Sequence, residues 1–377
     1  IGSYLGLYDL FSASSQRSGV GRFGLMDAGL FNAGGLIPAP PCAFSRVLLG
    51  WEQPQVLKKP ANAVTIRRAF STAPASVPTT VQIPINDDEY FLLENRGDPK
   101  VDIDSLYNEL SEGSSSSPSY LQVLKAYFKN KIEISPRGVL LSVPDYDWGL
   151  PGAGILIWHI DERVIAEKGA ENKINDDPND KAVNLKEADG SQDIGQSYSF
   201  FDAGYGKSLG WFADFWFSNR PSYLKDFELY QNEFSPLSRP NSNANFRRAN
   251  SHITLKNFSA NQKQTMTFDF MRDDYAPGFP LHLTQTGKML ALIVGTVVNQ
   301  QGEVIFCASS NGKIFAVKAN GAGLFFSNKK QIARCSASDS LMSLALGQGN
   351  KNGQNDILAV AGGDSLIAYS LTNISTD

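Results

Sequence analysis

The stretch Gly154-Ile-Leu-Ile-Trp158, followed by His159-Ile-Asp-Glu162, decides the fold predicted for this chain. Its apolar run has the length of one strand and falls far short of the ~18 residues that a bilayer span needs. Alternating or short apolar runs predict further strands elsewhere, at 63–66, 81–85, 89–93, 138–143, 182–185, 252–255 and 265–270. Residues 61–271 are therefore expected to form a β-rich, sandwich-like domain.

Helices are expected to be few and short, which gives an α+β fold class. Two prolines followed by apolar residues at helical spacing and a final glycine predict a helix over 41–49. A second brief helix is expected over 121–127. Residues 98–118 end in a run of serines and are predicted to be a flexible surface loop. The insertions 161–181 and 189–248 are long enough to be functional lids or ion-stabilised excursions.

The C-terminal part repeats itself after a predicted linker over 272–280. Three strand patterns recur within 281–377 at offsets of 52 or 53 residues, and such a period is typical of β-propeller blades. Because two blades cannot close a ring, we expect an incomplete propeller. The matching segments are 292–295 with 344–347, 304–307 with 357–360, and 314–317 with 366–369.

Composition excludes several classes of protein. The chain has 34 Lys and Arg against 38 Asp and Glu and no basic stripe, so nucleic acid is not expected as a partner. No apolar run is long enough to span a membrane. The three cysteines, Cys42, Cys307 and Cys335, lie too far apart for a Cys-x-x-Cys zinc site or a disulfide-rich scaffold.

Several motifs occur in an order that resembles one enzyme family. They are Ser3-Tyr-Leu-Gly-Leu-Tyr-Asp9, Phe23-Gly-Leu-Met-Asp-Ala-Gly29, Glu89-Tyr-Phe-Leu-Leu-Glu-Asn-Arg96, the stretch 150–162, and Leu185-Lys-Glu-Ala-Asp-Gly190. Over residues 1–271 the chain resembles the immune inhibitor A-like (M6) secreted metallopeptidases. The resemblance implies that residues 1–60 are the C-terminal part of a metzincin-like catalytic domain. It also implies an extracellular or cell-surface location and a protein or peptide substrate.

The family's zinc motif, H-E-x-x-H-x-x-G-x-x-D, matches this chain only in part. The resemblance implies that Gly6 and Asp9 are its glycine and aspartate, with Asp9 as third zinc ligand, and that Met26 forms the methionine turn. Ser3 stands where the second zinc-binding histidine belongs, and the His-Glu pair would precede Ile1. We therefore expect a metalloendopeptidase homologue with impaired catalysis, and an interior part of a longer protein.

The sequence allows two interpretations of Asp9, of Met26 and of the function. Asp9 is either a weak metal ligand, helped by upstream residues and water, or a turn carboxylate, and Met26 is either the methionine turn or a core side chain. The competing class of function is a non-enzymatic extracellular structural or adhesive protein that binds a protein or glycan assembly.

Acidic residues around the strand ends predict a calcium site, because Ca²⁺ prefers six to eight oxygen ligands in flexible geometry. The alternative is a set of solvated loop ends and helix N-caps. His159 belongs to the family motif, although a buried structural histidine is the commoner role. The candidate calcium ligands are Asp161, Glu162, Glu187, Asp189 and Asp193.

The insertion is rich in aromatic residues over 198–217. Exposed rings of this kind stack on sugars or form protein interfaces, so Trp211, Phe212 and Trp216 are a candidate binding platform. The alternative is that these side chains fold back into a small core of their own.

Overall fold

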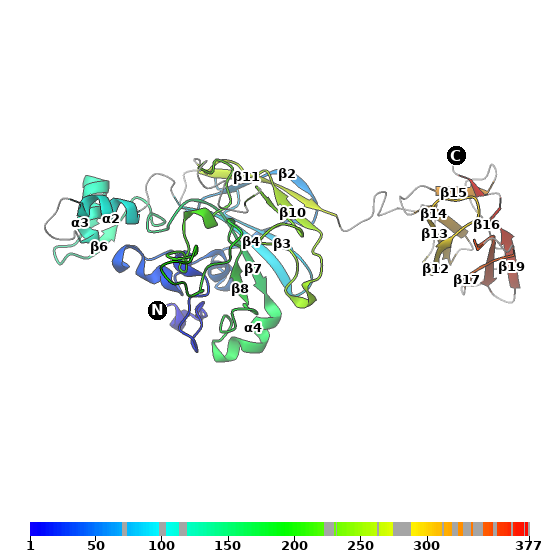
Figure 1. Cartoon of the computed structure of the whole chain (residues 1–377), viewed down its shortest axis with the longest axis horizontal. Coiled ribbons are helices and arrows are strands. Elements are labelled where there is room, and N and C mark those ends of the chain that lie inside the picture. Colours follow the sequence, from blue (N-terminus) through cyan, green and yellow to red (C-terminus); the bar gives the residue numbers. More distant parts are fainter. Residues whose placement is uncertain are drawn as a thin grey trace. The chain divides into compact units, whose positions relative to one another are not determined.

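The computed structural model divides the chain into two compact units, Ile1–Arg272 and Asp273–Asp377, each described separately below (Figure 1). The larger unit contains helices and strands, and the elements described in the smaller unit are strands. The protein is therefore α+β and β-rich, as predicted. Among the described helices, none is both long and apolar enough to cross a bilayer. The structure describes residues 1–69, 74–97, 103–112, 119–221, 230, 232–261, 264–273, 288–310, 313–318, 323–326, 333–334, 342–349, 353–362, 365–372 and 374–375.

The larger unit is built around strand β7 (Gly154–Asp161), all eight residues of which are buried. A strand buried on both faces has to be apolar nearly throughout, and the sequence of β7 meets that requirement. It pairs antiparallel with β4 (Glu89–Arg96), with Trp158 opposite Leu92. The five-stranded sheet has the order β1 (Gln55–Val56), β3 (Thr80–Pro84), β4, β7 and β8 (Val183–Leu185).

A second sheet shares the hydrophobic core of the first. Phe91 of β4 packs edge-on against Phe234 at 5.1 Å between ring centroids, and Trp216 lies against the same Phe234 at 5.5 Å. Such aromatic pairs contribute ~0.5–1.5 kcal/mol beyond their buried area. The sheet has the order β2 (Ala61–Arg67), β11 (Thr265–Arg272), β10 (Ile253–Lys256) and β9 (Glu233–Phe234).

Buried charges on β4 are paired within the protein. The guanidinium of Arg96 donates to both carboxylate oxygens of Asp147 at 2.8–3.0 Å and to Glu94 at 3.2 Å. The indole of Trp158 donates to the same Glu94 at 2.8 Å. Because these groups are almost fully buried, each needs its partner to offset desolvation.

The helices of the larger unit are α1 (Ala43–Leu48), α2 (Ile103–Ser111), α3 (Tyr120–Phe128) and α4 (Glu162–Lys168). α1 and α3 match the expected helices over 41–49 and 121–127. α2 lies in the part of 98–118 expected to be a loop, and that expectation is wrong for these residues; 98–102 and 113–118 lie outside the described residues. α3 and the hairpin of β5 (Glu133–Ile134) and β6 (Leu140–Ser142) contribute to a small separate core.

The smaller unit contains the sequence repeat as two three-stranded antiparallel meanders. Val304, Phe306, Leu358 and Val360, two residues from each meander, belong to one shared core. The first meander is β12 (Met289–Thr296), β13 (Glu303–Ser309) and β14 (Lys313–Lys318), and the second is β17 (Met342–Gly347), β18 (Ile357–Gly362) and β19 (Ser365–Ser370). Short strands β15 (Gly323–Phe326), β16 (Ala333–Arg334) and β20 (Ile374–Ser375) extend the first sheet.

His159 of β7 is buried and pairs with Glu89 of β4, its Nε2 lying 2.8 Å from the carboxylate. Burial, assisted by the charge of Lys186, lowers the pKa of His159 to about 4. The backbone amides of Asn245 and Phe246 also donate to Glu89. His159 is therefore a neutral structural residue that has no access to solvent.

We predict that His159 makes the larger unit acid-sensitive. Unfolded His159 takes up a proton near pH 6.5, whereas the folded residue does so only near pH 4. The contribution of His159 to the free energy of unfolding should therefore fall between these pH values by roughly 3 kcal/mol, at about 1.4 kcal/mol per pKa unit. His159→Gln keeps a donor for Glu89 and should flatten this slope in urea titrations; an unchanged slope would contradict the assignment.

Candidate functional site

A pocket of about 930 Å³ lies in the N-terminal segment of the larger unit. Ser3, Asp9 and Met26 line it, so side chains from two separate sequence motifs meet around one hollow. Most of its other walls are apolar, and they include Leu5, Leu7, Phe11, Leu25, Leu30 and Phe31. A hollow of this size and character suits an apolar or peptide ligand.

Ser3 and Asp9 stand on either side of a tight turn. Ser3 begins the 3₁₀-helix η1 (Ser3–Leu5), which ends at Gly6 with a left-handed φ of +92°. A side chain would be strained there, so glycine lets the chain reverse toward Asp9. The Asp9 carboxylate accepts from the Asn172 amide at 2.7 Å, and the backbone N–H of Asp9 donates back to Asn172 at 2.9 Å.

Met26 is half-buried at the base of the pocket, where it packs against the core and against the backbone of Gly2. The next residue, Asp27, accepts hydrogen bonds from the backbone amides of Gly19 and Val20 at 2.8 and 2.7 Å and from the Ser18 hydroxyl at 2.8 Å. Asp27 therefore fixes the 18–21 turn and is not free to act as a ligand. Nothing in the sequence around Asp27 indicates this role.

Zinc does not fit the residues that this chain places in the pocket. A catalytic zinc needs three protein ligands of the His, Cys or carboxylate type. In the part of the chain that the structure describes, Asp9 belongs to no group of three such residues. Ser3 offers only a neutral hydroxyl, and one oxygen of Asp9 is occupied by Asn172.

The predicted calcium ligands separate into two places. The backbone N–H of Lys186 donates to the carbonyl of Ile157 in the middle of β7. Glu187, the next residue, therefore lies near the middle of β7 and away from Asp161, which stands at the end of that strand. Asp161 caps α4 by accepting from Val164 N–H at 3.3 Å. Glu162 accepts from the Tyr90 hydroxyl at 2.7 Å. These two residues therefore have local structural roles and do not join the others.

Glu187 and Asp189 instead meet a residue that the sequence did not single out, Asp214. One carboxylate oxygen from each of the three lies within 4.8 Å of the others, and all three side chains are buried. Asp193 lies in the same loop, and its backbone N–H donates to Glu187 at 2.6 Å. Burial, followed by repulsion from the neighbouring carboxylates, raises the pKa of Glu187 and Asp214 well above their usual values. We call Glu187, Asp189, Asp193 and Asp214 the carboxylate cluster.

The candidate aromatic platform is not one surface. Trp216 is buried and its indole donates to the Lys186 carbonyl at 2.9 Å, so it belongs to the core. Phe212 also packs against the core, and the indole of Trp211 donates to Asp189 at 2.9 Å. The exposed rings of the insertion are others, namely Phe200, Phe201 and Tyr205.

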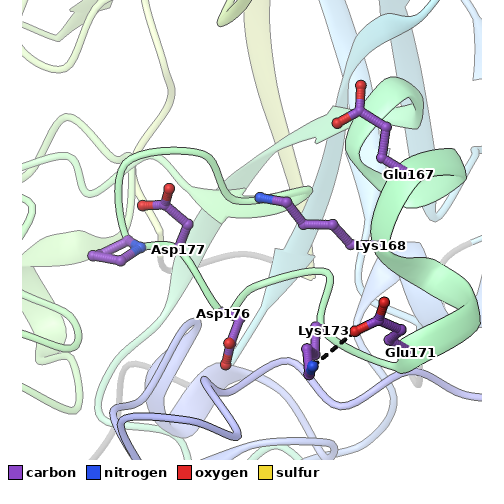
Figure 2. A pocket seen from close by; sticks show the side chains of 7 residues that line it. Glu167, Lys168, Glu171, Lys173, Asp176 and Asp177 are labelled. Carbon is purple, nitrogen blue, oxygen red and sulfur yellow. Dashed lines mark hydrogen bonds and ion pairs between the residues drawn. The ribbon is translucent and has the colours of Figure 1, made fainter.

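A second hollow lies beside α4 and is lined by charged side chains of both signs (Figure 2). Lys173 and Glu171 pair across 2.7 Å on its rim. Asp176 accepts from the Ser12 hydroxyl and the Ser14 backbone N–H, both at 2.9 Å. This hollow therefore marks where the 161–181 insertion is attached to the N-terminal segment, and its mixed charges favour no single ligand class.

Comparison with known proteins adds no assignment: no family model, curated protein or solved structure matches this chain.

We predict that Asn172 positions Asp9 and stabilises the N-terminal segment. Asn172 itself has a left-handed backbone with φ of 55°, so Asn172→Gly removes the side chain without backbone strain. The loss of two hydrogen bonds should lower the free energy of unfolding by about 1–2 kcal/mol. Asp9→Asn keeps an acceptor oxygen and should lose less in the same urea titration. Equal stability of Asn172→Gly and the native protein would contradict this role.

Proposed function

We propose that this protein is a secreted M6-type metallopeptidase homologue, impaired in hydrolysis, whose N-terminal pocket binds a protein or peptide. The observation that supports it is the convergence of Ser3, Asp9 and Met26 on one largely apolar pocket. Gly6 adds the turn that the zinc motif requires between two of them. An extracellular or cell-surface location belongs to the same proposal.

Hydrolysis would be impaired because Ser3 stands where the second zinc-binding histidine belongs. A bound zinc ion would polarise a carbonyl and lower the pKa of a water molecule, but Ser3 and Asp9 alone do not hold it. What the described residues still supply is an apolar surface with a positioned carboxylate. Such a surface can bind an extended peptide without cleaving it.

The same proposal includes a domain assignment for the two ends of the chain. Residues 1–60 would correspond to the end of a metzincin-like catalytic domain, and 281–377 to propeller-like repeats. The two matching meanders, β12–β14 and β17–β19, support the second assignment because each has the strand order and antiparallel pairing expected of part of a blade.

A second candidate function is a non-enzymatic adhesive protein of the extracellular space. Phe200, Phe201 and Tyr205 favour it, because they are 72%, 93% and 56% exposed and their rings contact one another. Exposed aromatic clusters of this kind occur at protein and glycan interfaces.

Ser3→His tests the reason given for impaired hydrolysis. An added imidazole next to the Gly6 turn would give zinc a second ligand with Asp9, so zinc affinity should rise at least about tenfold, or ~1.4 kcal/mol. Ser3→Ala is the matched control and should bind zinc as weakly as the native protein. Competition with a chromophoric chelator measures all three. An unchanged affinity of Ser3→His would place Ser3 outside any metal site.

Two exposed phenylalanines distinguish the two candidate functions. Phe31 lines the pocket and Phe201 belongs to the exposed aromatic cluster; they are 72% and 93% exposed. If the pocket binds peptides, Phe31→Asp should weaken the binding of fluorescein-labelled unfolded casein about tenfold, or ~1.4 kcal/mol, and Phe201→Asp should not.

Fluorescence anisotropy measures this binding, and the absence of any binding to the native protein would contradict the peptide proposal. The reverse pattern, loss of binding with Phe201→Asp only, would favour the adhesive function.

A further inference from the structure

We propose that the carboxylate cluster is a calcium site, with Glu187, Asp189 and Asp214 as its protein ligands and Asp193 beside them. The proposal does not depend on the peptide-binding function of the pocket. The sequence predicted calcium at Asp161, Glu162, Glu187, Asp189 and Asp193. The site proposed here keeps the last three of these residues, adds Asp214 and leaves out Asp161 and Glu162.

Two buried oxygens in this cluster have no hydrogen-bond partner among the residues that the structure describes. Oδ1 of Asp214 and Oδ2 of Asp193 are both unpartnered, and the two residues are 0% and 5% exposed. An unsatisfied buried oxygen costs about 1–3 kcal/mol, more when it is charged. Native structures therefore rarely retain one without a bound water or ion.

The remaining oxygens are arranged by donors from the loop itself. Ser191 N–H donates to Oδ1 of Asp189 at 3.0 Å, and Trp211 donates to Asp189 through its indole and to Asp214 through its backbone N–H at 2.8 Å. These bonds fix the orientation of the carboxylates, so the site is built before any ion binds.

In the described part of the chain, no cation contacts the cluster. No ion pair within 4.0 Å joins any of the four carboxylates to a Lys, Arg or His among the described residues. Lys181 and Lys207 act on Glu187 and Asp193 only at longer range. Several buried negative charges in one place repel each other strongly, and a divalent cation removes that repulsion.

The donor set selects the metal. The three ligand side chains offer oxygen and neither nitrogen nor sulfur. Glu187 and Asp189 lie in a loop, and Asp214 ends the 3₁₀-helix η6 (Phe212–Asp214). Ca²⁺ accepts six to eight such oxygens at variable geometry, whereas Mg²⁺ demands a regular octahedron and Zn²⁺ prefers histidine and cysteine.

The cluster holds a loop that forms part of the pocket wall. Leu209, between Asp193 and Asp214 in the chain, accepts from Arg22 N–H at 2.9 Å and lines the pocket together with Ser18. Gly195 is so close to Ser18 that a Cβ there would lie 2.2 Å from its carbonyl oxygen. A calcium ion in the cluster would therefore fix this side of the pocket.

Terbium luminescence tests the site directly with the metal alone. The Trp211 indole is hydrogen-bonded to Asp189, so Tb³⁺ in the cluster should emit when tryptophan is excited, and Ca²⁺ should displace it. Trp211→Phe should lose most of this emission while calcium still raises the melting temperature. With Ca²⁺ at about 100 times its Kd, we expect the melting temperature to rise by roughly 5–10 °C over protein in chelator.

Asp214→Asn removes one charged ligand and keeps the shape of the side chain. It should weaken calcium binding by at least roughly tenfold, the loss expected for even a supporting partner. Asp189→Asn serves as a second variant should the first fail to fold. Glu171→Gln, an exposed carboxylate in the charged hollow of Figure 2, is the matched control and should bind calcium normally. A native protein whose melting temperature ignores calcium, or an Asp214→Asn variant that binds calcium normally, would overturn the proposal.

Discussion

Complete burial of β7 is the constraint on which the rest of the larger unit depends. A strand covered on both faces cannot hydrogen-bond to water, so each of its polar groups needs a partner inside the protein. β4 supplies partners for two of these side-chain groups: Glu89 pairs with Nε2 of His159, and Glu94 accepts from the indole of Trp158. The pairing of these two strands therefore fixes the register of the sheet, since a slip by one residue would leave buried charges without partners.

Two points along β7, its end and its middle, lead to different sites. At one end Asp161 caps α4, and the insertion that follows returns to the N-terminal segment, where Asn172 holds Asp9. Beside the middle of β7, the chain leaves β8 at Lys186 and enters the loop of the carboxylate cluster. The pocket and the cluster are thus both attached to the same rigid strand, which is how a β-sheet positions functional loops.

The sequence predicts a strand or helix where the residues of that segment carry the pattern themselves. It does not predict one that depends on a residue far along the chain. The apolar run of β7 predicts a strand by itself. The prediction for β4 stopped at Leu93, because Glu94, Asn95 and Arg96 look like a polar turn; they are buried since Arg96 pairs with Asp147, far along the chain. The serine-rich end of 98–118 led to the prediction of a loop over the whole segment. The amphipathic spacing over Ile103–Ser111 would have predicted helix α2.

The candidate site shows the same limit. Ser3, Gly6, Asp9 and Met26 were identified from motifs and lie around or beside one pocket. Asn172 carries no signal, because nothing in its own segment indicates that it holds Asp9. The role of Asp214 could not be predicted either, since Asp214 lies among aromatic residues in the sequence and comes close to Glu187 only in the folded protein.

The larger unit thus buries carboxylates in two different ways. Around Arg96, two buried carboxylates share one guanidinium that the chain itself provides, and this network is complete without any ligand. In the carboxylate cluster the chain provides more acids, and among the described residues two of these acids have unpartnered oxygens and none contacts a cation. Because the fold pairs the buried acids around Arg96 so fully, we propose that a cation from solution compensates the unpaired acids of the carboxylate cluster. Such a cation would make the stability of the 187–214 loop depend on the ion supply of the protein's surroundings.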